Sequence, residues 1–205
     1  MSAIRELKRS TVEDYLAVDA ASPIGHEFRD SVIYARGGAT NDHGRLAGNL
    51  FAATHGVLPP RCDVFMGDMR LKLRALSDDA YYYPDVLATC SDLDRARDSD
   101  VYYPGIMVSC AASDRDRMFR REPILLIEVL SPSTGRLDRS EKRLKYLQIP
   151  TLQEFVLVAH DRPMVEILRR RTSWLVEEHF PGDTLTLESV GISLPLAEIY
   201  RTNTF

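Results

Sequence analysis

The segment "ILLIEVLSPST" (residues 124–134) is the part of the chain that decides the fold. Its first seven residues are aliphatic except for Glu128, and a turn-rich stretch follows. A short apolar run bounded by turn residues predicts a strand that is buried on both faces. An ionised carboxylate in such a place costs several kcal/mol unless it is paired or bound to a metal ion. Glu128 therefore needs either a cationic side chain or a metal ion as its partner.

The bulk composition is that of an ordinary globular protein. The 205 residues, 44% of them hydrophobic and 27% charged, suffice for one core, so we expect a single domain over residues 1–205. No apolar run approaches the ~20 residues of a membrane span, and the first residues lack a signal-peptide core, so we expect a cytoplasmic protein without membrane contact. The formal net charge of −4 excludes a global positive field that would attract nucleic acid.

Three cysteines give a second indication of the compartment. Cys62, Cys90 and Cys110 are odd in number, widely spaced and without a Cys-x-x-Cys pair. This pattern argues against a zinc site and against a disulfide framework, and it is typical of a reducing compartment.

Hydrophobic periodicity predicts an α/β or α+β protein with a mostly mixed sheet and few helices. A capping-box signature predicts a short helix over residues 11–19, and apolar residues at helical spacing, among them Leu46 and Leu50, predict a second over residues 43–55. Asp138, with Glu141 three residues on, opens a basic helix. Extended segments are expected at "EFRDSVIY", "CDVFMGD", "MRLKLRAL", "YYYPDVLATCS", "ILLIEVL", "EFVLVA", "MVEILRRR" and "SWLVEEHF".

Two acids occupy similar places in the predicted strands. Asp85 follows Pro84 at the start of "VLA", and Glu128 lies late in "ILLIEVL". If these strands are neighbours, their carboxylates can converge at one edge of the sheet. Mg²⁺ binds one or two carboxylates together with water and substrate phosphate, and it stabilises charge on a phosphate under attack. The pair predicts a site for Mg²⁺ (or Mn²⁺), although an ion pair at Glu128 and a turn at Asp85 are the simpler structural alternatives.

Lys142 lies on the helix that follows Glu128, within reach of the same strand ends. A lysine near a scissile phosphate can orient or deprotonate the attacking water, or stabilise the developing charge. The alternative is a solvated helix face, which the neighbouring Arg139, Arg143 and Lys145 favour. We expect His43, at a helix N-terminus, to cap or hydrogen-bond rather than to bind a metal.

Together these motifs resemble the Uma-two family of restriction endonucleases, a branch of the PD-(D/E)XK nuclease superfamily. The resemblance covers nearly the whole chain, and its most specific element is "EVLSPST…D…K…Y". It implies an α/β, restriction-endonuclease-like core in which a central mixed β-sheet is flanked by helices. It also implies catalytic residues at Asp85, Glu128 and Lys142, and metal ligands at Asp85 and Glu128 with Glu27 as a third acid.

The chain departs from the superfamily pattern at two positions. The lysine that normally stands two residues after the strand acid is replaced by Leu130, so Lys142 is a substitute from the following helix. The usual glycine near the first acid is Ser31, which concerns a backbone turn. The leading hypothesis is a Mg²⁺-dependent endonuclease that hydrolyses DNA, as a homodimer because cutting both strands requires two sites. The alternative is a non-catalytic nucleic-acid-binding or regulatory module that retains the nuclease fold.

Overall fold

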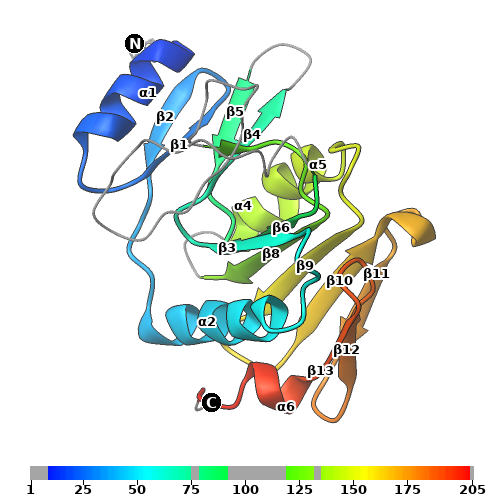
Figure 1. Cartoon of the computed structure of the whole chain (residues 1–205). Helices are drawn as coiled ribbons and strands as arrows, with labels where there is room; N and C mark the ends of the chain where they lie inside the picture. Colours follow the sequence, from blue (N-terminus) through cyan, green and yellow to red (C-terminus); the bar gives the residue numbers. More distant parts are fainter. Residues whose placement is uncertain (1–8, 75–78, 92–118, 132–134, 204–205) are drawn as a thin grey trace, which may run out of the picture.

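The segment around Glu128 forms β8 (Leu125–Leu130), a fully buried strand inside a six-stranded sheet (Figure 1). The structure is a computed structural model that describes residues 9–74, 79–91, 119–131 and 135–203. The strand order is β11-β10-β9-β8-β6-β3, and β8 runs parallel to β9 but antiparallel to β6. The sheet is therefore mixed, as the sequence predicts.

The remaining elements form a second sheet, a separate strand pair and the helices that cover them. The six-stranded sheet is completed by β3 (Asp63–Met66), β6 (Val86–Thr89), β9 (Glu154–Ala159), β10 (Val165–Arg169) and β11 (Val176–His179). A five-stranded sheet has the order β2-β1-β5-β4-β7, with β1 (His26–Arg29), β2 (Val32–Ala35), β4 (Arg70–Arg74), β5 (Asp79–Tyr82) and β7 (Phe119–Arg120). The separate pair is β12 (Thr184–Leu187) and β13 (Ile192–Pro195).

The helical elements are short apart from the first two. They are α1 (Val12–Ala21), α2 (Asn41–His55), α4 (Gly135–Leu137), the π-helical turn η1 (Asp138–Lys142), α5 (Arg143–Tyr146), the 3₁₀ turn η2 (Arg170–Thr172) and α6 (Leu196–Ile199). Within the described ranges, none of these helices has the length and hydropathy that a bilayer span requires.

Alternate residues of β8 face two different cores. Leu125, Ile127 and Val129 pack with Leu46 and Leu50 of α2 on one face of the sheet (Figure 1). This arrangement follows from the period of two along a strand.

The opposite face of β8 carries the acid. Leu126 and Leu130 pack there with Tyr146 at the end of α5 and with Leu157 of β9. Glu128 has the same phase as these two leucines, so its carboxylate lies on the side covered by η1 and α5.

The segment "YYYPDVLATCS" is two strands rather than the predicted single strand. Its first part belongs to β5 in the five-stranded sheet, and its second part forms β6 in the six-stranded sheet. Pro84 lies between them, and proline has no N–H with which to continue a ladder. The break places Asp85 at the start of β6, where the chain passes from one sheet to the other.

The segment "EFRDSVIY" is likewise a hairpin and not one strand. β1 and β2 pair antiparallel from His26↔Ala35 to Arg29↔Val32. The two turn residues, Asp30 and Ser31, have φ values of 50° and 60°. Two consecutive left-handed residues are the pattern of a type I′ hairpin turn. Ser31 thus has the backbone role that the sequence predicted, and the hairpin brings Glu27 of β1 to the middle of a paired strand.

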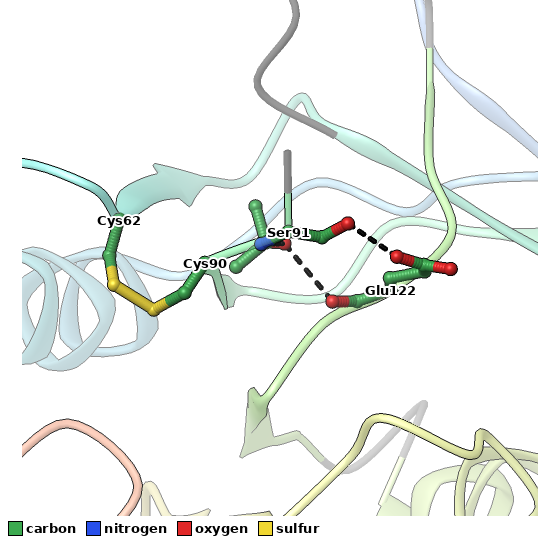
Figure 2. Close-up of a disulfide and its surroundings, with 5 residues drawn as sticks. Cys62, Cys90, Ser91 and Glu122 are labelled. Atoms are coloured by element: carbon green, nitrogen blue, oxygen red, sulfur yellow. Dashed lines mark hydrogen bonds between the residues drawn. A yellow bond between two sulfur atoms is a disulfide. The ribbon is translucent and has the colours of Figure 1, made fainter. Parts of the chain in front are cut away.

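A disulfide bond between Cys62 and Cys90 corrects the expectation that no cysteines are paired (Figure 2). β3 and β6 are antiparallel with Asp63 opposite Thr89, so the two cysteines face each other just beyond the end of this ladder. The count and spacing of the cysteines could not show this, because the two cysteines are 28 positions apart in the chain and meet only through the pairing of β3 with β6. Cys110 lies outside the described residues.

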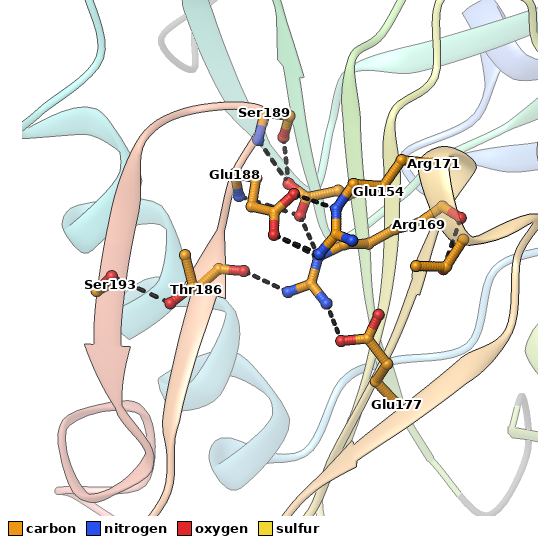
Figure 3. Close-up of polar contacts among 9 residues, drawn as sticks. Glu154, Arg169, Arg171, Glu177, Thr186, Glu188, Ser189 and Ser193 are labelled. Carbon is orange, nitrogen blue, oxygen red and sulfur yellow. Dashed lines mark hydrogen bonds and ion pairs between the residues drawn. The ribbon is translucent and has the colours of Figure 1, made fainter.

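A network around Arg169 attaches the β12–β13 pair to the six-stranded sheet (Figure 3). The guanidinium of Arg169 donates to Glu154 Oε1 at 3.0 Å, to Glu177, and to the carbonyl oxygen of Thr186 on β12 at 2.7 Å. The backbone N–H of Ser189 donates to Glu154 Oε2 at 2.8 Å. The buried charges of this network are matched by donors and acceptors from several elements, which is the arrangement of a structural ion pair.

Candidate functional site

Asp85 and Glu128 come together at the ends of two adjacent strands. In the antiparallel β6–β8 ladder, Val86 pairs with Ile127, so Asp85 lies beside Glu128 one position further along. The Oδ2 atom of Asp85 accepts a hydrogen bond of 2.7 Å from the backbone N–H of Val129. Both acids are buried, with exposures of 8% and 2%. The structure thus brings the two acids together on neighbouring strands.

Lys142 lies among three carboxylates. Its Nζ atom is 3.2 Å from Glu128 Oε1, 3.2 Å from Glu27 Oε1 and 3.1 Å from Asp138 Oδ1. Only 4% of the Lys142 surface is exposed, so the alternative of a solvated helix face does not hold. The ammonium group joins β1, β8 and the helical segment in one polar cluster.

A π-helical turn directs Lys142 inward. The helical segment begins at Gly135, three residues before the predicted start, and η1 occupies Asp138–Lys142. π-Helical turns are rare, and they often occur at functional sites. Asp138 and Lys142 are both buried and form an ion pair across this turn. The neighbouring Arg139 contacts Glu166 instead, outside the cluster.

Each of the two strand acids has one oxygen held by donors from the protein. Glu128 Oε1 accepts from the hydroxyl of Tyr146 at 2.9 Å and from Lys142. Asp85 Oδ2, which already accepts from the backbone of Val129, is also 3.2 Å from His43 Nε2 in the first turn of α2. Among the described residues, the hydrogen bonds and ion pairs of these acids involve Glu128 Oε1 and Asp85 Oδ2, and none involves Glu128 Oε2 or Asp85 Oδ1. One oxygen of each acid therefore remains for a further partner.

Burial and like charges shift the pKa values in this cluster. Burial raises the pKa of Glu128 well above 4.5; Lys142 opposes this shift, while Asp138, Asp85 and Glu27 add to it. Burial alone would lower the pKa of Lys142, but the surrounding carboxylates, Glu128 first, raise it above its ordinary value. The lysine is therefore held as an ammonium ion, and the carboxylates around it are short of positive charge.

The cluster contains more carboxylates than cations. Glu27 has a second cation, because Arg29 NH1 lies 3.3 Å from its Oε2 atom. Apart from that contact, Lys142 is shared by three acids. Within the described residues, the polar partners of Asp85 are His43 and one backbone donor. Buried carboxylates in excess of their cations are unfavourable unless another cation is supplied. The cluster has the charge of a cation-binding site.

The donor chemistry fits a hard divalent cation held by few protein ligands. In the part of the chain that the structure describes, no three His, Cys, Asp or Glu side chains are grouped as a ready-made metal site. Mg²⁺ commonly binds only one or two carboxylates and keeps several water molecules. The open oxygens of Asp85 and Glu128 match this requirement. Glu27 is placed differently, because both of its oxygens contact cations.

Two residues of the cluster had no role assigned from the sequence. Asp138 and Tyr146 stand four residues before and after Lys142, as "D…K…Y". Residues four apart share a helix face, so this spacing could have placed both side chains beside Lys142. The spacing of four residues was therefore visible in the sequence, but the neighbouring arginines and lysines favoured the interpretation that the helix is exposed to solvent.

Sequence comparisons place the chain among proteins of one family. Residues 12–197 match the sequence profile of the Uma2 family, described as "Putative restriction endonuclease". The uncharacterized protein slr1290 of Synechocystis sp. is 29% identical over 191 residues, which cover 92% of this chain and 90% of that protein. A second Synechocystis protein, sll1609, is 28% identical over 159 residues, or 77% of this chain and 79% of the relative.

A solved structure shares the fold. The crystal structure of "a putative nuclease belonging to DUF820" from Anabaena variabilis superimposes with a TM-score of 0.71. The match covers 93% of this chain and 97% of the other, at 17% sequence identity. The likeness therefore extends over both sheets and is a likeness of fold.

Proposed function

The chain belongs to the Uma2 family, and we propose that it is a metal-dependent endonuclease that hydrolyses phosphodiester bonds of DNA. The proposal rests on one observation. Asp85, Glu128 and Lys142 are buried in one cluster, and one carboxylate oxygen of each acid has no hydrogen bond or ion pair with the described residues. The family description and the description of the structural neighbour as a nuclease support the same reaction class.

Asp85 and Glu128 are the proposed ligands of a Mg²⁺ or Mn²⁺ ion. Such an ion would supply Lewis-acid stabilisation of charge on the phosphate and would lower the pKa of a water molecule. The two acids would hold it through the oxygens that His43, the Val129 N–H, Tyr146 and Lys142 leave open. Glu27 is the third candidate ligand. It would bind the ion only by giving up its contact with Lys142 or with Arg29.

Lys142 acts in this proposal as a charged hydrogen-bond donor. Three carboxylates at 3.1–3.2 Å hold it in the ammonium form, so it is poorly suited to accept a proton from water. An ammonium group next to the ion can orient the attacking water or stabilise negative charge on the phosphate. Of the roles that the sequence allowed for Lys142, deprotonation of the attacking water is therefore excluded from the proposal, and another group must act as the general base.

A non-catalytic nucleic-acid-binding or regulatory module is the second candidate. The contact of Lys142 with Glu27, Glu128 and Asp138 favours it, since the lysine already supplies a cation to the cluster. A protein of this kind would bind DNA without needing Asp85 or Glu128. The two candidates therefore differ in their dependence on metal ions.

The test is cleavage of supercoiled plasmid DNA by the purified protein with Mg²⁺ or Mn²⁺, compared with the same reaction in EDTA. We expect nicked and linear products only with the ion, and loss of cleavage in Asp85→Asn and Glu128→Gln. Asp42→Asn, at an exposed acid that pairs with Arg45, is the matched control. Plasmid that stays intact with either ion, together with DNA binding unchanged in all variants, would favour the non-catalytic module. The proposal includes a homodimer in the cytoplasm, and sedimentation velocity would test the dimer.

A further inference from the structure

We infer that Tyr146 is a positioning residue of this site, which fixes one oxygen of Glu128 so that the other is presented to the metal ion. The inference rests on the proposed function, because it concerns how a metal ligand is oriented. It goes further in assigning a role to a side chain that would touch neither the ion nor the substrate.

The hydroxyl of Tyr146 is placed firmly enough for such a role. Tyr146 is completely buried at the end of α5, and its hydroxyl donates to Glu128 Oε1 at 2.9 Å. Its ring is held edge-on by Tyr82 and by Phe155, with centroid distances of 5.5 and 5.4 Å and interplanar angles of 89° and 86°. A phenol packed between two rings has little freedom to leave its acceptor.

The carboxylate of Glu128 needs such a constraint. Lys142 contacts the same oxygen, but its ammonium also contacts Glu27 and Asp138, so it does not act on Glu128 alone. The Tyr146 hydroxyl donates its hydrogen bond to Glu128 Oε1. This bond fixes Oε1 toward the protein interior and leaves Oε2 for the metal ion. Outer partners that orient metal ligands typically change metal affinity by about 10–100-fold when they are removed.

The competing explanation is that Glu128 merely satisfies a buried phenol. In that case the hydrogen bond would affect stability and leave ion binding unchanged. Tyr82 offers a matched comparison, because it is equally buried, packs against Tyr146, and donates to Glu141 at 3.1 Å. Removal of either hydroxyl deletes one hydrogen bond, but only the Tyr146 hydroxyl touches a proposed metal ligand.

The experiment measures Mn²⁺ binding by isothermal titration calorimetry for the full chain and for Tyr146→Phe and Tyr82→Phe. We expect Tyr146→Phe to bind Mn²⁺ about 10–100-fold more weakly, and Tyr82→Phe to stay within about two-fold of the unchanged protein. Equal affinity of Tyr146→Phe and the unchanged protein would overturn the inference but leave the proposed function intact. Equal losses in both variants would also overturn it, since they would indicate general loosening of the core. No Mn²⁺ binding by the unchanged protein would remove the proposed function and the inference together.

A second measurement needs no variant and therefore does not depend on how Tyr146→Phe folds. Buried, hydrogen-bonded tyrosine hydroxyl protons exchange slowly enough to be followed by NMR. Saturating Mg²⁺ should shift the Tyr146 hydroxyl resonance strongly, because its acceptor Glu128 gains a cation, and should shift that of Tyr82 much less. Resonances that move equally, or not at all while the ion binds, would contradict the inference.

Discussion

Glu128 Oε1 and Lys142 Nζ lie 3.2 Å apart, although the two residues come from a central strand and a π-helical turn 14 positions further along the chain. This ion pair offsets part of the cost of burying the Glu128 carboxylate. The compensation is incomplete, because the same ammonium also pairs with Glu27 and Asp138. The expected consequences concern both the stability of the metal-free protein and the chemistry of the site.

Replacement of Lys142 by methionine should destabilise the metal-free protein strongly. Removing one partner of a buried ion pair leaves an uncompensated charge, which costs about 3–5 kcal/mol. Denaturant unfolding in EDTA should show this loss, and excess Mg²⁺ should reduce it, because the ion supplies the missing positive charge. If Lys142→Met unfolds at the same denaturant concentration as the unchanged protein in EDTA, then Lys142 does not offset the cost of burying the three carboxylates.

Lys142 should also matter for cleavage far more than its neighbour Lys145. Lys142→Ala should lower the rate of plasmid cleavage by about 10²-fold or more, since under the proposed function it removes a charged donor next to the phosphate. Lys145 is more exposed and pairs with Asp30 and Glu141, so Lys145→Ala should have little effect. Small, similar losses in both variants would mean that the helix contributes only general positive charge.

Neighbouring residues of β8 should respond in opposite ways to substitution. Ile127→Asp places an unpaired charge in the core with Leu46 and Leu50, and it should prevent folding. Glu128→Gln keeps the shape of the side chain and removes a charge that is short of compensation, so it should leave the protein folded. Near-UV circular dichroism distinguishes the two outcomes. Loss of the folded signal in Glu128→Gln would make Glu128 a structural residue.

Much of the fold could be predicted because β8 and its surroundings follow simple periodic rules. The two faces of β8 follow from alternation alone, and Leu46 and Leu50 of α2 were identified by their helical spacing. The proximity of Asp85 and Glu128 could be predicted because each acid lies near one end of an apolar strand, where turn-forming residues interrupt the apolar run. The mixed sheet followed from the same strand pattern.

Other features depend on contacts between distant segments, which the local pattern does not show. The disulfide between Cys62 and Cys90 requires the register of β3 against β6. The change of sheet at Pro84 depends on which strands pair with β5 and β6. The contact of Tyr146 with Glu128 likewise depends on how the helical segment packs against β8, although the spacing of four residues from Lys142 is visible in the sequence.

His43 should make the stability of the metal-free protein depend on pH. The hydrogen bond to Asp85 is the main cause that raises the pKa of His43 above 6.5, while burial partly opposes it. Because the folded-state pKa is the higher one, the contribution of His43 to stability is complete below the unfolded-state value and is lost as the pH rises through the folded-state value. We expect a contribution of about 1 kcal/mol, at the low end for a charge-assisted hydrogen bond, since the imidazole is partly exposed.

The measurement compares unfolding of the unchanged protein and of His43→Gln in EDTA, at about pH 6 and about pH 9. His43→Gln should be less stable than the unchanged protein at the lower pH, and the difference should shrink at the higher pH. His55→Gln, at the exposed end of the same helix, is the control, because it removes a histidine that packs on Phe51 and not on Asp85. A deficit of His43→Gln that is the same at both pH values would show that the imidazole holds Asp85 as a neutral donor, without the ionic contribution expected here.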